Sequence, residues 1–290
     1  HVEDESAVDM IERATERLAQ KLNLNLREDV DLILTNVSCL DLPFTGCGAS
    51  VANRIGAQPK YILDVQNSGC VSFVYMMEMA HSLMQTTGAR SALICNVQNA
   101  AGRVFSHPDI RTKPQSAVPG DACGVGLLVV GGNSPIKSIK TANFGEYADD
   151  MQVVNEDDEK WWAPRKKPLY IDFTERKIGA IVSRGNKLVP EIIREACKAA
   201  EISTDDIGCL VTNQPNRIFI RNWREALCLP EEKQVHTYPE HGNTFGAAIP
   251  VSLERAIEEG TIKPGDHIAL GGFSHAGDYA ASAVIQWQAN

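Results

Sequence analysis

The strongest constraint on the fold of this chain is a repeated order of helices and strands. The first half reads as a helix, a short apolar strand, a buried helix and two buried strands, at residues 6–24, 31–37, 70–85, 91–97 and 123–131. The second half repeats this order at residues 188–200, 207–213, 243–259, 267–272 and 279–287. Helices that alternate with continuous apolar strands indicate an α/β fold whose strands are largely buried.

Short phrases at the boundaries of these elements also match between the halves. The sequence DVDLILTN at residues 29–36 parallels DIGCLVTN at residues 206–213. The segments at residues 87–94 and 262–270 are alike in the same way. Self-similarity of this kind predicts a duplication in which two similar halves are related by a pseudo-twofold axis.

The repeat divides the chain into two predicted domains, residues 1–135 and residues 136–290. In this register the turn at Cys70 corresponds to the turn at Gly242 and Asn243, and each turn opens the buried helix of its half. Helix N-termini offer backbone N–H groups and positive potential, which suit a thiolate and an oxyanion. We therefore expect the functional groups to gather where these two helices begin.

Cys70 is the predicted nucleophile. It ends the run ILDVQNSGC at residues 62–70, in which a hydrophobic strand leads into a short polar turn. A thiol in the first turn of a helix lies in the positive end of the helix dipole, which lowers its pKa and favours the thiolate. The alternative is a buried cysteine with only a packing role.

The composition is that of an ordinary globular protein. Charged residues make up 22% of the 290 residues and the net charge is −9, which argues against nucleic-acid and anionic-membrane partners. No run reaches the roughly 18 to 20 apolar residues of a membrane span. The eight cysteines form no CxxC pair and no Cys/His cluster with zinc spacing, which predicts reduced thiols in a cytoplasmic protein without a metal.

Three motifs together resemble the β-ketoacyl-acyl-carrier-protein synthase III family of thiolase-fold enzymes. They are DVQNSGC at residues 64–70, GDACGVGLLV at residues 120–129, and HGNT with AAIP at residues 241–244 and 247–250. The resemblance covers nearly the whole chain. The family's first strand has no counterpart in it, so we expect an N-terminal segment to be missing before His1.

The resemblance implies a thiolase fold in a five-layer α/β/α/β/α arrangement, a homodimer, and acyl transfer from a thioester to a cysteine. In the family a malonyl thioester then decarboxylates and attacks the acyl-cysteine, and a histidine and an asparagine assist. Cys70 matches the nucleophile and Asn243 matches the asparagine. No cofactor is implied, because acyl-CoA or acyl-acyl-carrier-protein (acyl-ACP) is the substrate.

Two departures from the family pattern bear on the second half of this chemistry. The family's His-Gln-Ala-Asn is NQPN at residues 213–216, so Asn213 replaces the histidine. An amide donates hydrogen bonds but takes no proton at neutral pH. The glycine-rich loop at residues 271–278, which borders the family's active site, carries His275 and Asp278 here. A histidine oriented by an aspartate supplies a general base to a cysteine, a hydroxyl or an amine.

This pattern resembles the synthase-III-like acyltransferases of secondary metabolism, which pass an acyl group to a hydroxyl, an amine or another acceptor without decarboxylation. We expect an acyl-S-Cys70 intermediate, a carbonyl or acceptor oriented by Asn213, and His275 or His241 as the base. One alternative is a decarboxylating synthase that makes a carbon–carbon bond. The other is a non-catalytic subunit paired with an active homologue.

Two other polar segments receive plainer interpretations. The stretch at residues 149–167 contains Trp161 and Trp162, and we interpret it as a solvated loop, with an aromatic substrate mouth as the alternative. His107 lies beside Pro108 and Asp109 and is expected at the surface.

Overall fold

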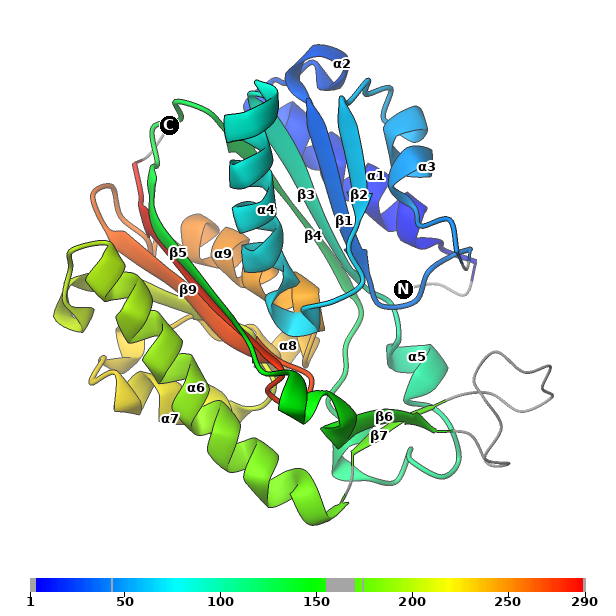
Figure 1. Ribbon diagram of the computed structural model, residues 1–290, viewed down its shortest axis with the longest axis vertical. Helices are drawn as coiled ribbons and strands as arrows, with labels where there is room; N and C mark the ends of the chain where they lie inside the picture. The colour runs from blue at the N-terminus through cyan, green and yellow to red at the C-terminus, as the bar shows by residue number, and fades with distance from the viewer. Residues whose placement is uncertain (1–3, 43, 155–169, 174, 289–290) are drawn as a thin grey trace.

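The computed structural model describes residues 4–42, 44–154, 170–173 and 175–288, which form two four-stranded sheets (Figure 1). The first sheet has the order β2-β1-β3-β4, with β1 (Leu32–Val37), β2 (Tyr61–Asp64), β3 (Ser91–Gln98) and β4 (Ala122–Val129). The second has the order β5-β10-β9-β8, with β5 (Ile136–Asn143), β8 (Ile207–Thr212), β9 (His267–Ser274) and β10 (Tyr279–Gln286).

The pairing of the strands reproduces the repeat in the sequence. In the first sheet β1 is parallel to β3, and β4 is antiparallel to β3. In the second sheet β8 is parallel to β9, and β10 is antiparallel to β9. Thus β1, β3 and β4 correspond to β8, β9 and β10. The second sheet also has β5 along the outer edge of β10, a strand that we did not predict from the sequence.

Helices pack on both faces of each sheet. Between the sheets lie α4 (Ser72–Thr87) and α9 (Ala248–Glu258) (Figure 1). The far face of the first sheet is covered by α1 (Ala7–Leu22) and α3 (Gly48–Arg54). The far face of the second sheet is covered by α6 (Ile178–Ala199) and α7 (Arg217–Ala226). The central core contains Val74 of α4, Ile249 of α9 and Leu270 of β9. The predicted α/β fold class is confirmed.

Both central helices begin in the same way, deep inside the molecule. A 3₁₀ turn, η1 (Gly69–Val71), leads into α4, and a second one, η7 (Phe245–Ala247), leads into α9. The two turns touch, since a Cβ on Gly246 would lie 2.8 Å from the Gly69 carbonyl oxygen. This contact places the two matching turns of the repeat side by side.

Two helix boundaries differ from the predicted ones. α6 begins at Ile178 rather than at residue 188, because Ile181 and Gly185 extend the buried stripe of the helix by further turns. α9 begins at Ala248 rather than at residue 243, because η7 and the turn before it occupy the intervening residues.

The remaining elements are short. They are α2 (Leu26–Asp29), α5 (Ala101–Val104), α8 (Tyr238–His241), and a hairpin of β6 (Met151–Val154) and β7 (Tyr170–Phe173). The surface prediction for His107 is wrong, since the ring is buried and stacks on Tyr170 of the hairpin at 4.5 Å. Trp161 and Trp162 lie outside the described residues. No helix within the described ranges has both the length and the apolar character of a membrane span.

Candidate active site

Cys70 lies in a tight turn that is pressed against the end of β9. Ser68 and Gly69 have φ angles of 63° and 32°, in the left-handed region. The backbone N–H of Cys70 donates to Ser274 Oγ at 3.1 Å. A Cβ on Gly69 would lie 2.5 Å from Ser274 Oγ and 2.7 Å from His275 Nε2. Only glycine therefore fits at residue 69, and its absent side chain lets the histidine ring lie beside the cysteine.

Cys70 is only 7% exposed, and this burial raises the pKa of its thiol to about 12. Hydrogen bonds from the Asn213 side chain and from the backbone N–H of His275 lower the pKa, but by less than burial raises it. The prediction that the helix dipole gives this cysteine a lowered pKa is therefore wrong, because desolvation outweighs the stabilising groups. The thiol is protonated at neutral pH, and its activation requires a base.

His275 is held in a defined orientation by Asp278. Its Nδ1 lies 3.0 Å from Oδ2 and 3.1 Å from Oδ1 of the carboxylate. A carboxylate only accepts, so Nδ1 carries the proton and Nε2, on the side of Gly69, is free to take one. Asp278 is buried, whereas the imidazole is partly exposed. A histidine held in this way can take a proton from a thiol or from an incoming nucleophile.

Asn213 follows β8 and lies between the thiol and β9. Its backbone N–H donates to the Gly271 carbonyl at 3.1 Å, and its Nδ2 donates to the Phe273 carbonyl at 3.2 Å. Its Oδ1 is buried and has no partner among the described residues. The amide can thus donate to sulfur, but it cannot serve as a base.

Asn243 lies on the matching turn of the second half. Its backbone pairs with the strand-like segment before β4, donating to Val118 O at 2.7 Å and accepting from Gly120 N at 3.0 Å. Its Oδ1 accepts from Phe245 N at 3.1 Å. Because Oδ1 is engaged in this way, Nδ2 is the end of the amide available to a substrate carbonyl.

The structure thus places three of the other five predicted site residues near Cys70 and a fourth on the adjoining turn. Asn213, His275 and Asp278 surround Cys70, and Asn243 lies across the contact between η1 and η7. The fifth, His241, has a side chain that is 42% exposed and lies 3.9 Å from Glu240. No contact among the described residues joins His241 to the cysteine.

Sequence reasoning missed Ser274 and Arg184, which bind the Cys70 turn and the histidine loop. Ser274 Oγ accepts the Cys70 N–H, and Arg184 of α6 donates to the Ala276 carbonyl. Ser274 lies within the glycine-rich loop at residues 271–278, directly before His275, and that placement was the one signal for it; Arg184 belongs to no motif. Among the described residues no group of three or more His, Cys, Asp or Glu is placed to hold a metal ion.

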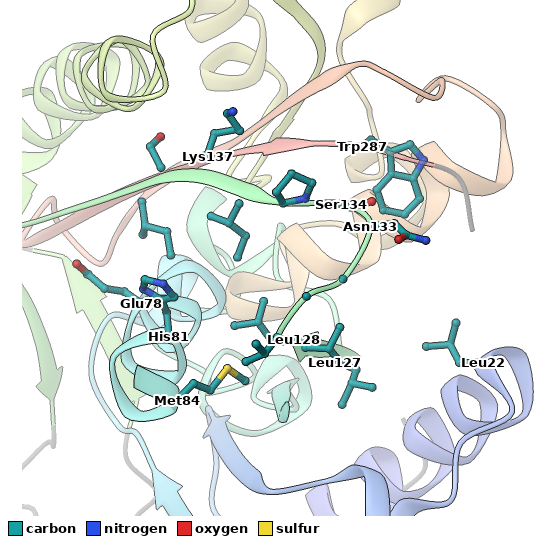
Figure 2. Close-up of a pocket in the computed structure, with 18 of the residues that line it drawn as sticks. Leu22, Glu78, His81, Met84, Leu127, Leu128, Asn133, Ser134, Lys137 and Trp287 are labelled. Carbon is teal, nitrogen blue, oxygen red and sulfur yellow. The ribbon is translucent and has the colours of Figure 1, made fainter. Parts of the chain in front are cut away.

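A large groove lies elsewhere on the molecule. It has a volume of about 1250 Å³ and runs past the C-terminal part of α4, the β4–β5 connection and the end of β10. Figure 2 places Met84, Leu128 and Trp287 around it. Cys70 precedes the opposite end of α4, and none of the predicted site residues lines the groove. Size alone does not make this groove the active site.

Two family models match the chain, and together they span more than half of it. The model described as 3-oxoacyl-[acyl-carrier-protein (ACP)] synthase III matches residues 63–147, and the model of its C-terminal part matches residues 197–287. Among curated relatives, the β-ketoacyl-[acyl-carrier-protein] synthase III of Clostridium perfringens is 26% identical over 97% of this chain and 85% of its own. That of Ruegeria is 28% identical over 98% and 85%.

Solved structures agree with these sequence matches. The synthase III of Thermus thermophilus has a TM-score of 0.85 and 25% identity, covering 100% of this chain and 87% of its own. OleA of Xanthomonas campestris has the same fold, with a TM-score of 0.82, 19% identity, and coverage of 99% and 82%. The chain has a thiolase fold and belongs to the synthase III-like family of the thiolase superfamily. It is an enzyme of the synthase III type.

Proposed function

We propose that this enzyme forms an acyl-S-Cys70 intermediate and passes the acyl group to an oxygen or nitrogen nucleophile. The observation that carries the proposal is the His275–Asp278 pair at 3.0 Å, with Nε2 beside the turn of a buried, protonated cysteine. Position 213, where relatives with the family motif have histidine, holds an amide. Among the described residues, the base proposed for the Cys70 turn is therefore His275, on the loop after β9.

In the first half-reaction His275 Nε2 takes the proton of the Cys70 thiol, and the thiolate attacks the thioester carbonyl. Asn243 Nδ2 donates to the developing oxyanion, which gains strength from the buried surroundings. The tetrahedral adduct collapses, the carbon–sulfur bond of the donor breaks, and the imidazolium returns its proton to the departing thiol. The products are acyl-Cys70 and a free donor thiol.

In the second half-reaction the same imidazole takes a proton from the acceptor hydroxyl or amine as it attacks the acyl-Cys70 carbonyl. The bond from carbon to Cys70 sulfur breaks, and the imidazolium reprotonates the thiolate. The high pKa of this thiol favours its return to the neutral form. No step needs decarboxylation, so the histidine that is absent at residue 213 is not required.

The names of the relatives suggest the acyl donor, and an exposed edge strand suggests how two copies of the chain assemble. Relatives are named for acyl carrier protein, which supports acyl-ACP or acyl-CoA as donor. β2 lies at the edge of the first sheet, and its Tyr61 and Ile62 are 49% and 38% exposed. Such an edge fits a homodimer in which a second copy covers these side chains.

A decarboxylating synthase is the second candidate, because the curated relatives are named β-ketoacyl-[acyl-carrier-protein] synthase III, the family whose resemblance implies that chemistry. The experiment that decides uses intact-protein mass spectrometry with a panel of acyl-CoA donors, malonyl-CoA included, followed by small alcohols, amines and sugars as acceptors. We expect an adduct that is lost in Cys70→Ala, and acyl transfer that falls about 10²- to 10⁴-fold in His275→Gln, the range for a lost general base.

His241→Gln is the matched control and should keep the wild-type rate, because that side chain is 42% exposed and its ion-pair partner is Glu240. Release of carbon dioxide with a carbon–carbon product would refute the proposal in favour of the synthase. An unmodified Cys70 with every CoA and acyl-carrier-protein donor would favour a non-catalytic subunit.

A further inference from the structure

We propose that Arg184 is a positioning residue for the His275–Asp278 pair, acting from α6 through the loop between them. The inference rests on the proposed role of His275 as base. In the backbone of this loop His275 has a φ of 48° and Gly277 a φ of 103°. A non-glycine residue in the left-handed region is strained and persists where its surroundings hold it.

Arg184 makes several of the contacts that keep this loop in its strained conformation. Its Nη1 donates to the carbonyl oxygen of Ala276, the residue that follows His275. Its side-chain stem lies against Gly277, where a Cβ would overlap it. From the other side, Phe144 N donates to the Asp278 carbonyl at 2.7 Å. The backbone of this loop is therefore held at Ala276 by Arg184 and at Asp278 by Phe144, and Ala276 is fully buried.

The guanidinium is itself fixed by a buried carboxylate. Nη1 and Nη2 of Arg184 both lie 3.1 Å from Asp150 Oδ2, and Lys177 pairs with Oδ1. Asp150 is only 3% exposed, and these two cations hold the pKa of its carboxyl below the ordinary value. The Tyr147 ring stacks on the guanidinium, with 3.4 Å from Cζ to the ring centroid.

These contacts require arginine at residue 184. A planar guanidinium can bond one carboxylate and one carbonyl at once and present its face to a ring, whereas an ammonium is a point charge on a flexible stem. Lysine would keep the ion pair with Asp150 and lose the fixed bond to Ala276. Arg184→Lys therefore separates the charge of the residue from its grip on the loop.

The test follows the alkylation of Cys70 by iodoacetamide from pH 5.5 to 9 in Arg184→Lys and Asp150→Asn, alongside acyl transfer. We expect folded proteins in which alkylation at neutral pH is about 10- to 100-fold slower and its pH profile moves upward, as a displacement of roughly 1 Å would cause. The control is Arg54→Lys, an exposed arginine paired with Asp9 and Glu12, which should match wild type.

A purely structural role would lower the melting temperature of Arg184→Lys without moving the pH profile of alkylation, and that result would overturn the inference. If this variant does not fold, Arg184→Ala with added guanidinium chloride at low concentration decides: recovery of the alkylation rate supports the inference, and no recovery contradicts it. Alkylation needs neither donor nor acceptor. Failure of acyl transfer in wild type, with the alkylation result intact, would count against the proposed function alone.

Discussion

Replacing Gly69 by alanine tests the geometry of the site most directly. The residue has a φ of 32°, and a Cβ there would lie 2.5 Å from Ser274 Oγ and 2.7 Å from His275 Nε2. One methyl group must therefore strain the nucleophile turn and push aside both the hydroxyl that binds the Cys70 N–H and the proposed base. Neither Cys70 nor His275 is changed chemically.

The size of the effect can be worked out from its parts. The left-handed backbone costs alanine about 1 to 2 kcal/mol more than glycine. Overpacking against Ser274 and His275 adds about 1 to 3 kcal/mol. The free energy of unfolding should fall by roughly 2 to 5 kcal/mol in total. A shift of the imidazole by about 1 Å should slow acylation of Cys70 about 100-fold.

Gly88→Ala is the matched control. Gly88 has a φ of 70°, follows the same helix α4, and has no atom within 4 Å of a Cβ placed on it. In Gly88→Ala the free energy of unfolding should therefore fall only by the cost of backbone strain, about 1 to 2 kcal/mol, and the acylation rate should not change. Urea unfolding gives the stabilities, and intact mass after mixing with an acyl-CoA gives the rates.

The result that would refute this reasoning is an acylation rate in Gly69→Ala within about twofold of that in Gly88→Ala, far short of the loss expected for a displaced base. The imidazole would then not need to lie beside residue 69, and the base would have to be sought elsewhere. That conclusion would hold even if the free energy of unfolding fell by the full amount expected, because the acylation rate is what reports on the position of the imidazole.

Two further predictions concern the oxyanion site and the buried thiol. Asn243→Ala should slow acylation by about 10²- to 10³-fold, the loss measured for single oxyanion donors, with little change in the donor concentration for half-maximal rate. The pKa of Cys70 is about 12 in the folded protein and near its ordinary value of 9.0 when unfolded. The unfolded chain thus loses its proton first, so the stability that this thiol contributes is complete below about pH 9 and is lost as the pH rises toward 12. Between pH 8 and 11 the free energy of unfolding, measured with urea, should fall less steeply with pH in Cys70→Ala than in wild type. Equal slopes would contradict the raised pKa of the buried thiol.

The architecture could be predicted because the same order of helices and strands occurs twice in the sequence. The strands that correspond, such as β1 and β8, carry apolar runs that only a sheet covered on both faces accommodates. The position of the turns at Cys70 and Asn243 followed from aligning the halves. The periodicity could not predict β5, whose sequence IKSIKTAN mixes polar and apolar residues without strict alternation and contains no buried run.

The electrostatics of the site were harder to predict than its membership. A helix start favours a thiolate, but whether it prevails depends on how completely the sulfur is buried, and the burial of Cys70 comes from β9 and Asn213, far away in the sequence. The same holds for Arg184, whose partners Asp150 and Ala276 lie 34 and 92 residues away. Contacts over such separations leave no local pattern in one sequence.

The two departures from the family motif, at residues 213 and 275, are connected in space. Asn213 Nδ2 has two hydrogens, and it serves both the Phe273 carbonyl and the Cys70 thiol. A neutral imidazole has one N–H and could not do both. The amide thus bonds the end of β9, just before His275, and also donates to the sulfur. His275 lies beside Gly69 on a partly exposed loop. If it is the base, as proposed, an incoming hydroxyl or amine would meet it there.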